Sequence, residues 1–284
     1  MANKVIYKLK GHEKFPLREG WLTKGIMAAN DNLKIFTDSK GPDVLGVGTN
    51  MVKSIRYWLL ATKLIERRKN TEEISSLAKI IFEKDPYLED VFSLWLIHSN
   101  LVKNIESATV WYMFFNKLDI DEFNKSDLQN QISLELFKYI GASVNEGAVK
   151  DDIDVLLNMY SKDMKKYDDP EEKNVCPLSA LGLIRKEEET YMKVQPDLRK
   201  LNDYVILYEL SCMFQNEKSL SIEKIATGEH SLGAIYHLTK VMVNKYLDNL
   251  EALGCIKVDR TAGLDVVYPV DVKTPIEIVR AYYK

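Results

Sequence analysis

Three stretches of the chain carry apolar residues at the spacing of one helix face. The clearest runs from residue 51 to residue 67, where basic side chains lie off an apolar face formed by Met51, Ile55, Trp58, Leu59 and Thr62. This pattern is typical of an amphipathic helix, and Thr49 or Asn50 is expected to cap it. Similar patterns predict helices over residues 146–160 and 239–253. Helix is therefore expected to dominate the fold.

The C-terminal part of the chain has the most complete order of elements. A short helix and a turn are expected over residues 220–236, followed by a longer helix over 239–253. Residues 255–260 then alternate like a strand, 261–263 form a turn, and 264–268 form a return strand. Helix, turn, helix and hairpin is the order of a winged helix. In DNA-binding helix-turn-helix proteins the second helix enters the major groove, but winged helices also serve as docking modules.

Two other ranges, 41–67 and 123–160, have a similar helix-turn-helix pattern. The predicted fold class is therefore mainly α with small β-hairpins, built from tandem helix-turn-helix or winged-helix units. We expect a basic N-terminal helix-turn-helix unit over residues 1–70 and an acidic helical middle with a second helix-turn-helix over 71–174. A C-terminal winged-helix domain is expected over 175–284.

Composition narrows the class of protein. With 46% hydrophobic and 29% charged residues in 284 positions, the chain resembles an ordinary folded protein. Its apolar runs are far shorter than the ~20 residues needed to span a bilayer. Charged residues recur from Lys4 onward, unlike in a secretory leader, so a cytoplasmic protein is expected. The widely spaced Cys176, Cys212 and Cys255 are expected to be buried thiols.

The formal net charge of -3 conceals an uneven distribution. Residues 1–70 carry 14 Lys and Arg against 6 Asp and Glu, a net charge of +8. Residues 71–174 carry 11 against 21, a net charge of -10, and residues 175–284 carry 14 against 15. Clustered basic residues favour contact with a polyanion such as nucleic acid. The alternative is that the basic and acidic ranges dock on each other and neutralise internally.

Residues 85–98 combine carboxylates with a histidine. If Pro86 begins a helix, Asp85 is its N-cap. The candidate catalytic residues are Asp85, Glu89, Asp90 and His98. Carboxylates of this kind can hold Mg²⁺ or Mn²⁺ for cutting a phosphodiester, although the metal ligands stay unassigned. The alternative is a capped core helix whose acidic residues complement the helix dipole. The aromatic run at 111–115 favours a core role over a base-stacking platform.

Candidate DNA contacts are basic or phosphate-binding residues near the predicted helix-turn-helix units. They are Lys14, Arg18, Lys24, Thr49, Asn50, Lys53, Arg56, Lys240 and Lys245. The same N-terminal region contains His12 and Glu13. Three roles stay open for these two residues, namely a hydrogen-bonded structural pair, contact with DNA, and catalysis.

Several motifs, in the same order along the chain, resemble those of one family. They are Gly11-His12-Glu13-Lys14-Phe15, Leu45-Gly46-Val47-Gly48, Asp85-Pro86-Tyr87-Leu88-Glu89-Asp90, Leu94-Trp95-Leu96-Ile97-His98 and Trp111-Tyr112. The chain resembles the SspB-like family, formerly described as a domain of unknown function, which is found beside bacterial DNA phosphorothioation genes. The resemblance covers nearly the whole chain.

This resemblance implies a DNA-binding component of a DNA phosphorothioation and phage-defence system, which nicks or prepares a strand for sulfur insertion. The implied partners are double-stranded DNA, a cysteine desulfurase, an ATPase and a sulfur transferase. One alternative is a non-catalytic winged-helix subunit that binds DNA and recruits the other components. A transcription regulator is a further alternative, although no effector-sensing domain is evident. Sequence specificity and homo-oligomerisation stay open.

Overall fold

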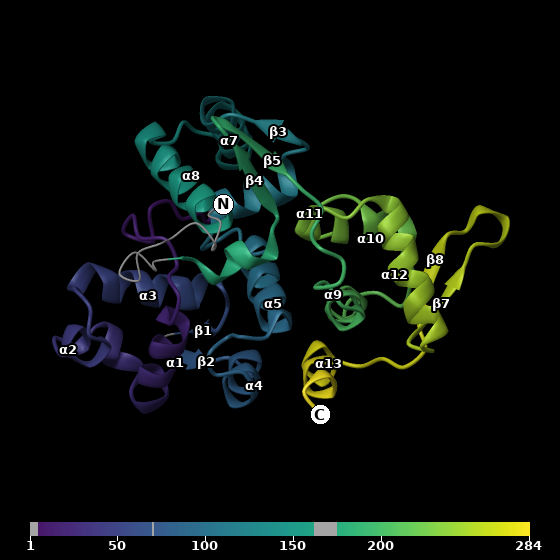
Figure 1. Ribbon diagram of the computed structural model, residues 1–284, viewed down its shortest axis with the longest axis horizontal. Helices are drawn as coiled ribbons and strands as arrows, with labels where there is room; N and C mark the ends of the chain where they lie inside the picture. The colour runs from purple at the N-terminus through teal and green to yellow at the C-terminus, as the bar shows by residue number, and fades with distance from the viewer. Residues whose placement is uncertain (1–4, 70, 162–174) are drawn as a thin grey trace. The chain divides into compact units, whose positions relative to one another are not determined.

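The chain forms two compact units, Met1–Val194 and Gln195–Lys284, whose helices and strands are shown in Figure 1. The structure is a computed structural model that describes residues 5–69, 71–161 and 175–284. These residues form helices and three small antiparallel sheets, in agreement with the predicted class, mainly α with small β elements. Within the first unit the N-terminal segment packs on α8 (Glu146–Ser161), because the backbone N–H of Lys10 donates to Asp152.

The N-terminal part of the first unit ends in a β-hairpin. It comprises α1 (Trp21–Asp31), η1 (Leu33–Phe36), α2 (Gly41–Leu45), α3 (Thr49–Ala61), β1 (Ile65–Arg68) and β2 (Thr71–Ile74). The buried face of α3 is the predicted one, with Ile55, Trp58 and Leu59 fully buried.

Helix α3 differs from the prediction at both ends. Its N-cap is Gly48 rather than Thr49 or Asn50. The helix ends at Ala61, because the Thr62 hydroxyl donates to the Trp58 carbonyl and Lys63 turns the chain at φ 54°. Residues 65–67 therefore form a strand instead of the last helical turn.

The remainder of the first unit surrounds a helix that is buried on nearly every side. Its elements are α4 (Ser76–Lys84), α5 (Val91–Val102), α6 (Thr109–Tyr112), the π-helix η2 (Met113–Lys117), β3 (Glu122–Phe123), α7 (Lys125–Ile140), α8, η4 (Pro177–Leu181), β4 (Ile184–Glu187) and β5 (Thr190–Lys193). From Phe92 to Val102 every residue of α5 is buried. The aromatic run at 111–115 is also buried, which confirms its predicted core role.

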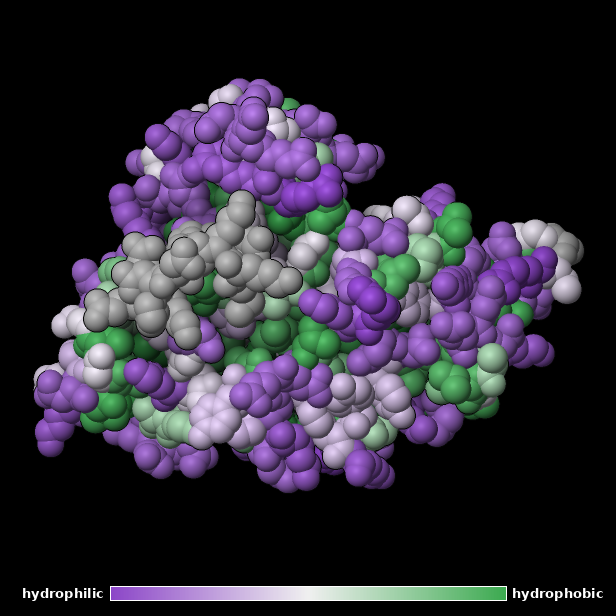
Figure 2. Space-filling view, in the orientation of Figure 1, coloured by the Kyte–Doolittle hydropathy of each residue, from purple (hydrophilic) through white to green (hydrophobic). Residues whose placement is uncertain are grey.

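Helices α7 and α8 pack side by side, joined by a loop that begins at Gly141 with φ 75°. The predicted helix over residues 146–160 is confirmed as α8. The surface over this pair is mostly hydrophilic (Figure 2). Apolar residues of both helices face inward, since Leu128, Ile132 and Leu156 are fully buried.

The second unit contains the most accurately predicted elements. They are α9 (Asp203–Phe214), β6 (Leu220–Ser221), α10 (Ile222–Ala226), α11 (Leu232–Tyr236), α12 (Lys240–Ala252), β7 (Ile256–Asp259), η5 (Thr261–Gly263), β8 (Val266–Pro269) and α13 (Pro275–Tyr282). The predicted long helix, turn and hairpin correspond to α12, η5 and the β7–β8 pair. The range 220–236 differs, because it holds a short strand and two helices. The strand order is β6-β8-β7.

The three cysteines were predicted to be buried thiols, and one of them is. Cys176 is buried, whereas Cys212 and Cys255 are partly exposed. Burial raises the pKa of the Cys176 thiol to about 12, so this thiol stays protonated at neutral pH. Among the described helices, none has the length and apolar character required to cross a membrane.

Candidate nucleic-acid interface

We define the first segment as residues 41–74, which contain α2, α3, β1 and β2. The N-terminal turn of α3 is exposed at Thr49, Asn50 and Lys53. The Lys53 ammonium donates to the Asn50 side-chain oxygen over 3.3 Å. Three of the predicted DNA-contacting residues are thereby brought together at one solvent-facing helix end.

Arg56 forms an ion pair that joins helix α3 to the hairpin. Its Nε and Nη2 donate to the two carboxylate oxygens of Glu72 over 3.2 and 2.6 Å. Such a bidentate fork fixes the guanidinium more firmly than a single contact does. Arg56 therefore supports the geometry of the first segment, and its charge is partly neutralised.

The hairpin carries two exposed arginines that the sequence reasoning did not select. The side chains of Arg67 and Arg68 are 66% and 69% exposed. Arg67 lies 3.5 Å from Glu72, and Arg68 pairs with Glu73. Residues 65–68 and 71–74 contain one apolar residue each, Ile65 and Ile74, which pair across the hairpin. Neither run alternates apolar and polar residues, so the sequence pattern does not indicate these strands.

The second segment, residues 222–269, places α10, α11 and α12 before the β7–β8 hairpin, and two of its exposed cations lie next to carboxylates. Lys240 lies 2.7 Å from Glu223. Arg260 lies 2.7 Å from Asp248. Lys245 is exposed on α12. The surface around these residues is therefore close to neutral.

The second segment also exposes large apolar side chains. Val241, on α12, is 76% exposed, and Leu253, directly after this helix, is 65% exposed. Figure 2 shows a hydrophobic patch over the C-terminal end of α12. Apolar exposure of this kind fits protein contact better than phosphate contact.

His12 lies inside the first unit and pairs with a residue that the sequence reasoning did not select. Its Nε2 is 2.8 Å from Oδ1 of Asp152, and both side chains are almost fully buried. The imidazole stacks on Trp58 with ring centroids 5.9 Å apart. Glu13 is exposed, so the structural partner of His12 is Asp152 rather than Glu13. No local sequence signal joins residues 140 positions apart.

The residues around His12 fasten the N-terminal segment to α8. The backbone N–H of Lys10 donates to Asp152 over 2.9 Å. The ammonium groups of Lys10 and Lys14 lie 2.8 and 3.2 Å from Asp151, and they lower the pKa of its carboxyl group. Lys14, a predicted DNA contact, is thus engaged in an ion pair, whereas Lys24 is exposed on α1.

The predicted helix start at Pro86 is wrong, because Asp85 to Asp90 form a turn between α4 and α5. Asp85 accepts hydrogen bonds from the Glu89 and Asp90 backbone N–H groups and from the Ser93 hydroxyl over 2.9, 3.2 and 2.6 Å. The N-cap of α5 is Asp90, whose side chain accepts from the Phe92 N–H. The carboxylate of Asp85 therefore holds the turn together.

The other two candidate catalytic residues lie in contrasting surroundings. His98 is fully buried, and its Nδ1 lies 2.7 Å from the Tyr160 hydroxyl. Glu89 is exposed and lines a cavity. Over residues 5–69, 71–161 and 175–284, no group of three or more His, Cys, Asp or Glu side chains is placed to hold a metal ion. Asp85, Glu89, Asp90 and His98 therefore do not form a preassembled Mg²⁺ or Mn²⁺ site.

The cavity beside Glu89 has a volume of about 300 Å³. It is lined by Arg18, Glu19, Gly20, Leu22, Tyr87, Leu88, Glu89, Leu94, Val175, Pro177 and Ala180. The structure thus brings a predicted DNA-contacting arginine and a predicted catalytic carboxylate to the same cavity. The guanidinium of Arg18 lies 5.6 Å from the Phe15 ring and 5.2 Å from the Trp21 ring.

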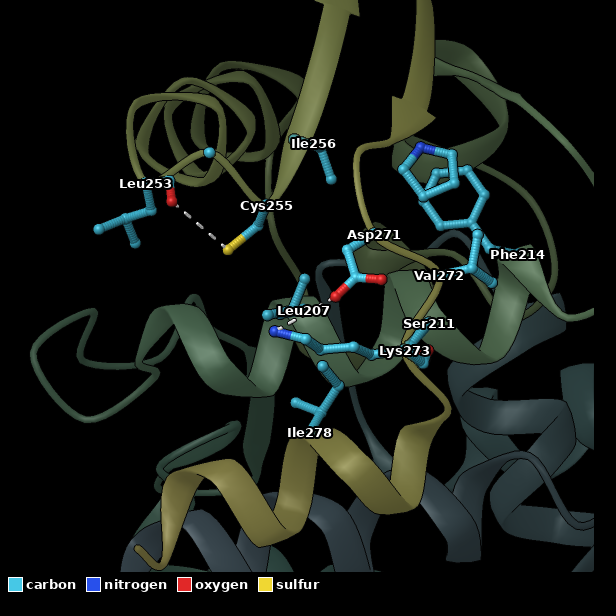
Figure 3. Close-up of a pocket in the computed structure, with 12 residues that line it drawn as sticks. Leu207, Ser211, Phe214, Leu253, Cys255, Ile256, Asp271, Val272, Lys273 and Ile278 are labelled. Atoms are coloured by element: carbon cyan, nitrogen blue, oxygen red, sulfur yellow. Dashed lines mark hydrogen bonds and ion pairs between the residues drawn. The ribbon is translucent and has the colours of Figure 1, made fainter.

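A second pocket lies within the C-terminal unit. Figure 3 shows the Asp271 and Lys273 side chains beside the apolar side chains of Leu207 and Ile278. The Lys273 ammonium is 3.8 Å from the Asp271 carboxylate, so its charge is internally compensated. This pocket lacks the concentration of positive charge expected of a phosphate site.

Lys193 has an unusual environment at the end of β5. Its ammonium donates to the carbonyls of Phe114 and Leu118 over 2.8 Å each and lies 4.5 Å from the Phe114 ring. Burial lowers the pKa of Lys193 to about 7, although Asp119 and Asp121 act in the opposite direction. The amine is therefore partly neutral near physiological pH.

The chain matches two crystal structures of the same fold and one protein family. A crystal structure described as magnesium ion-bound SspB is 23% identical, with a TM-score of 0.85 over 96% of this chain and 86% of that chain. An SspB crystal structure is 22% identical, with a TM-score of 0.85 over 98% and 87% of the two chains. No curated protein matches. Residues 9–283 match the family described as "Protein of unknown function (DUF4007)", and the chain therefore belongs to this SspB-like family.

Proposed function

We propose that the protein is the DNA-binding component of a bacterial DNA phosphorothioation and phage-defence system and that its first segment contacts duplex DNA. The observation that carries this proposal is the exposed end of α3 next to a hairpin with two exposed arginines. Membership of the SspB-like family and the likeness to the SspB crystal structures support the assignment to such a system.

The geometry suits contact with a DNA backbone. In this proposal both segments are winged-helix modules, and α3 is the helix that enters the major groove. The N–H groups at the start of α3 and the hydroxyl and amide of Thr49 and Asn50 are donors to phosphate oxygens. Lys53 supplies a cation at the same helix end, and Arg67 and Arg68 supply cations from the hairpin, as a wing does.

A salt titration tests this proposal directly. The triple variant Lys53→Ala, Arg67→Ala, Arg68→Ala is compared with the wild type for binding to a fluorescent duplex at several salt concentrations. We expect about a tenfold or greater loss of affinity and a slope shallower by about three, because each phosphate contact contributes about one unit.

Lys240→Ala with Lys245→Ala, in the second segment, is the matched control and is expected to bind within about twofold of the wild type. Equal affinity and slope for the wild type and the triple variant would remove the first segment from the interface. Loss of binding in the control variant alone would instead place DNA on the second segment.

Strand nicking is a second candidate function. Two observations favour it, namely the magnesium ion in a crystal structure of the same fold and the Glu89 carboxylate at a cavity. Supercoiled plasmid incubated with the protein and Mg²⁺ or Mn²⁺ is expected to become open circles, and Glu89→Gln is expected to reduce their rate at least tenfold.

The candidate catalytic residues Asp85, Asp90 and His98 need a fold control in the nicking experiment. Asp85→Asn, Asp90→Asn and His98→Gln are compared by thermal unfolding, since all three side chains have structural hydrogen bonds. An absence of open circles with wild-type protein favours the non-catalytic recruitment subunit. Nicking that is unchanged in all four variants would exclude this cluster.

We place the protein in the cytoplasm, where its three free cysteines stay reduced. The proposed partners are a cysteine desulfurase, an ATPase and a sulfur transferase. The exposed apolar side chains of the second segment support a docking role for that segment.

A further inference from the structure

Arg18 is partly buried, and within the described residues 5–69, 71–161 and 175–284 no carboxylate forms an ion pair with it. Its Nε is buried without a hydrogen-bond partner. Burial lowers the pKa of its guanidinium. A partly desolvated charge that lacks a partner is unfavourable, and an arginine in this state is suited to accept an anionic ligand.

We propose that the cavity lined by Arg18, Leu22, Tyr87 and Glu89 binds a nucleoside phosphate, with the phosphate on Arg18 and the nucleoside against the apolar wall. The ligand is either the phosphorylated end of a DNA strand or a free nucleotide. Both present the same chemistry to the cavity. The site shares no residue with the first segment, so it stands apart from the proposed duplex contact.

The phosphate end of the ligand follows from the geometry of Arg18. The rings of Phe15 and Trp21 hold its guanidinium at 5.6 and 5.2 Å, which orients the planar fork before a ligand arrives. Arginine binds phosphate through parallel N–H donors. The cavity is also lined by Gly20, the residue before α1, so the positive end of an 11-residue helix adds to the attraction.

The nucleoside end follows from the remainder of the lining. The apolar wall of the cavity is formed by Leu22, Leu88, Leu94 and Pro177. Tyr87 is 70% exposed, and its ring is available to stack on a base. Glu19 and Glu89 supply carboxylates that accept hydrogen bonds from amino or hydroxyl groups. These two carboxylates would repel a lone phosphate, so they favour a phosphate that carries an organic group with donors.

The size and preorganisation of the cavity agree with this ligand class. A volume of about 300 Å³ lies at the lower end of the range for small-molecule sites, about 300–1,000 Å³. The Thr23 hydroxyl donates to the Pro86 carbonyl over 2.8 Å, which fastens the turn with Tyr87 and Glu89 to α1. A site held in this way loses little entropy when a ligand binds.

Direct binding tests the proposal. The full chain is titrated by calorimetry and by tryptophan fluorescence with the four deoxynucleoside 5′-monophosphates, with deoxyadenosine and with inorganic phosphate. We expect at least one monophosphate to bind at least tenfold more tightly than deoxyadenosine or phosphate. The fluorescence of Trp21 should change on binding, because its ring lies 5.2 Å from the guanidinium.

Two variants remove the site in different ways, and a third is a control. Arg18→Gln removes the charge, and Ala180→Trp fills the cavity while Arg18 stays in place. Both should weaken monophosphate binding at least tenfold, and Lys34→Gln, at an exposed position of η1 that does not line the cavity, should not. Thermal unfolding of each variant checks the fold. If no monophosphate binds, or if both cavity variants bind it as the wild type does, the proposal is overturned.

Oligonucleotides distinguish the two sources of the ligand. A single strand with a 5′-phosphate is compared with the same strand bearing a 5′-hydroxyl, in wild-type and Arg18→Gln protein. A phosphate-dependent gain that is lost in Arg18→Gln identifies a strand end, whereas tighter binding of the monophosphate identifies a free nucleotide. Either result keeps the site. The Lys53, Arg67 and Arg68 triple variant should bind the monophosphate normally, so a failure of duplex contact is separable from a failure of this cavity.

Discussion

The first and second segments each place a hairpin after their longest helix, α3 or α12, and they differ in charge. Residues 41–74 carry 6 Lys and Arg against 4 Asp and Glu, whereas residues 222–269 carry 5 against 6. In the first, Lys53 stands at an exposed helix end, and the exposed Arg67 and Arg68 of the hairpin lie next to Glu72 and Glu73. In the second, Lys240 and Arg260 lie within 2.7 Å of carboxylates, and large apolar side chains are exposed beside them. The same arrangement of elements therefore supports two kinds of surface.

The difference shows that function depends on the side chains placed on this arrangement rather than on the arrangement itself. A cation that is paired with a carboxylate must lose that partner before it binds a phosphate, and this holds for Arg67 and Arg68 as it does for Lys240 and Arg260. The contrast therefore rests on Lys53 and the exposed start of α3. Inside the first segment the Arg56–Glu72 fork joins α3 to the hairpin, and His12, which pairs with Asp152, stacks on Trp58 of α3. Changes at Asp152, Lys193 and Arg56 should alter the stability of the first unit by decreasing amounts.

Asp152→Ala should lower the free energy of unfolding of the first unit by about 3 kcal/mol, because it leaves His12 and the Lys10 N–H without their buried acceptor. All four tryptophans, Trp21, Trp58, Trp95 and Trp111, belong to this unit, so urea unfolding followed by tryptophan fluorescence reports on it alone. Asp151→Ala, at the neighbouring position, is the control and should cost less than about 1 kcal/mol. Equal losses of unfolding free energy in both variants would show that the buried His12–Asp152 pair stabilises the unit no more than the exposed ion pairs of Asp151 do.

Lys193 should make the stability of the first unit rise with pH. Burial lowers its pKa to about 7 in the folded chain from the usual 10.5 of a lysine. The unfolded chain therefore binds more protons between these pH values, and the free energy of unfolding rises with pH there. Between pH 7 and pH 9 the gain should be about 2 kcal/mol. Urea unfolding at both pH values measures it.

Lys193→Met is the matched variant for this pH dependence. Methionine has no titrating amine, so the rise in unfolding free energy between pH 7 and pH 9 should be smaller by about 2 kcal/mol. A wild-type profile as flat as that of the variant would contradict a lowered pKa for Lys193.

Arg56→Ala should cost about 1 kcal/mol of unfolding free energy in the first unit, because it breaks the partly buried bidentate fork with Glu72. Arg260→Ala breaks the corresponding helix-to-hairpin pair of the second segment, which is more exposed, and should cost about 0.5 kcal/mol or less. Tryptophan fluorescence follows the first variant and far-UV circular dichroism follows the second. A larger loss of unfolding free energy for Arg260→Ala than for Arg56→Ala would show that the Arg56–Glu72 ion pair does not stabilise the first segment.

Local patterns were sufficient for much of the helical framework. The apolar stripes of α3, α8 and α12 and the hairpin of the second unit were predictable, because short-range periodicity determines which face is buried. The end of α3 was not, because the turn at Lys63 depends on a left-handed residue without a glycine. The missed β1–β2 hairpin followed from that error, since its strand begins at Ile65.

The roles and surroundings of the candidate site residues were less predictable from the sequence than the helices and strands were. The sequence placed Asp85 at a helix start, but its carboxylate closes the turn before α5, where Asp90 is the cap. Arg18 was selected for its charge alone, and its aromatic neighbours and unpaired Nε became apparent only in the folded chain. Such properties depend on which distant groups surround a side chain, and sequence spacing does not record them.

By itself the sequence determined the helical class, the basic N-terminal range, the core role of residues 111–115 and the family resemblance. Only the tertiary structure decided that His12 pairs with Asp152 across 140 positions and that Arg18 and Glu89 share a cavity. Periodicity and charge are local properties that the chain carries before it folds. Pairing, burial and the lack of a partner arise when distant segments pack together and exclude water.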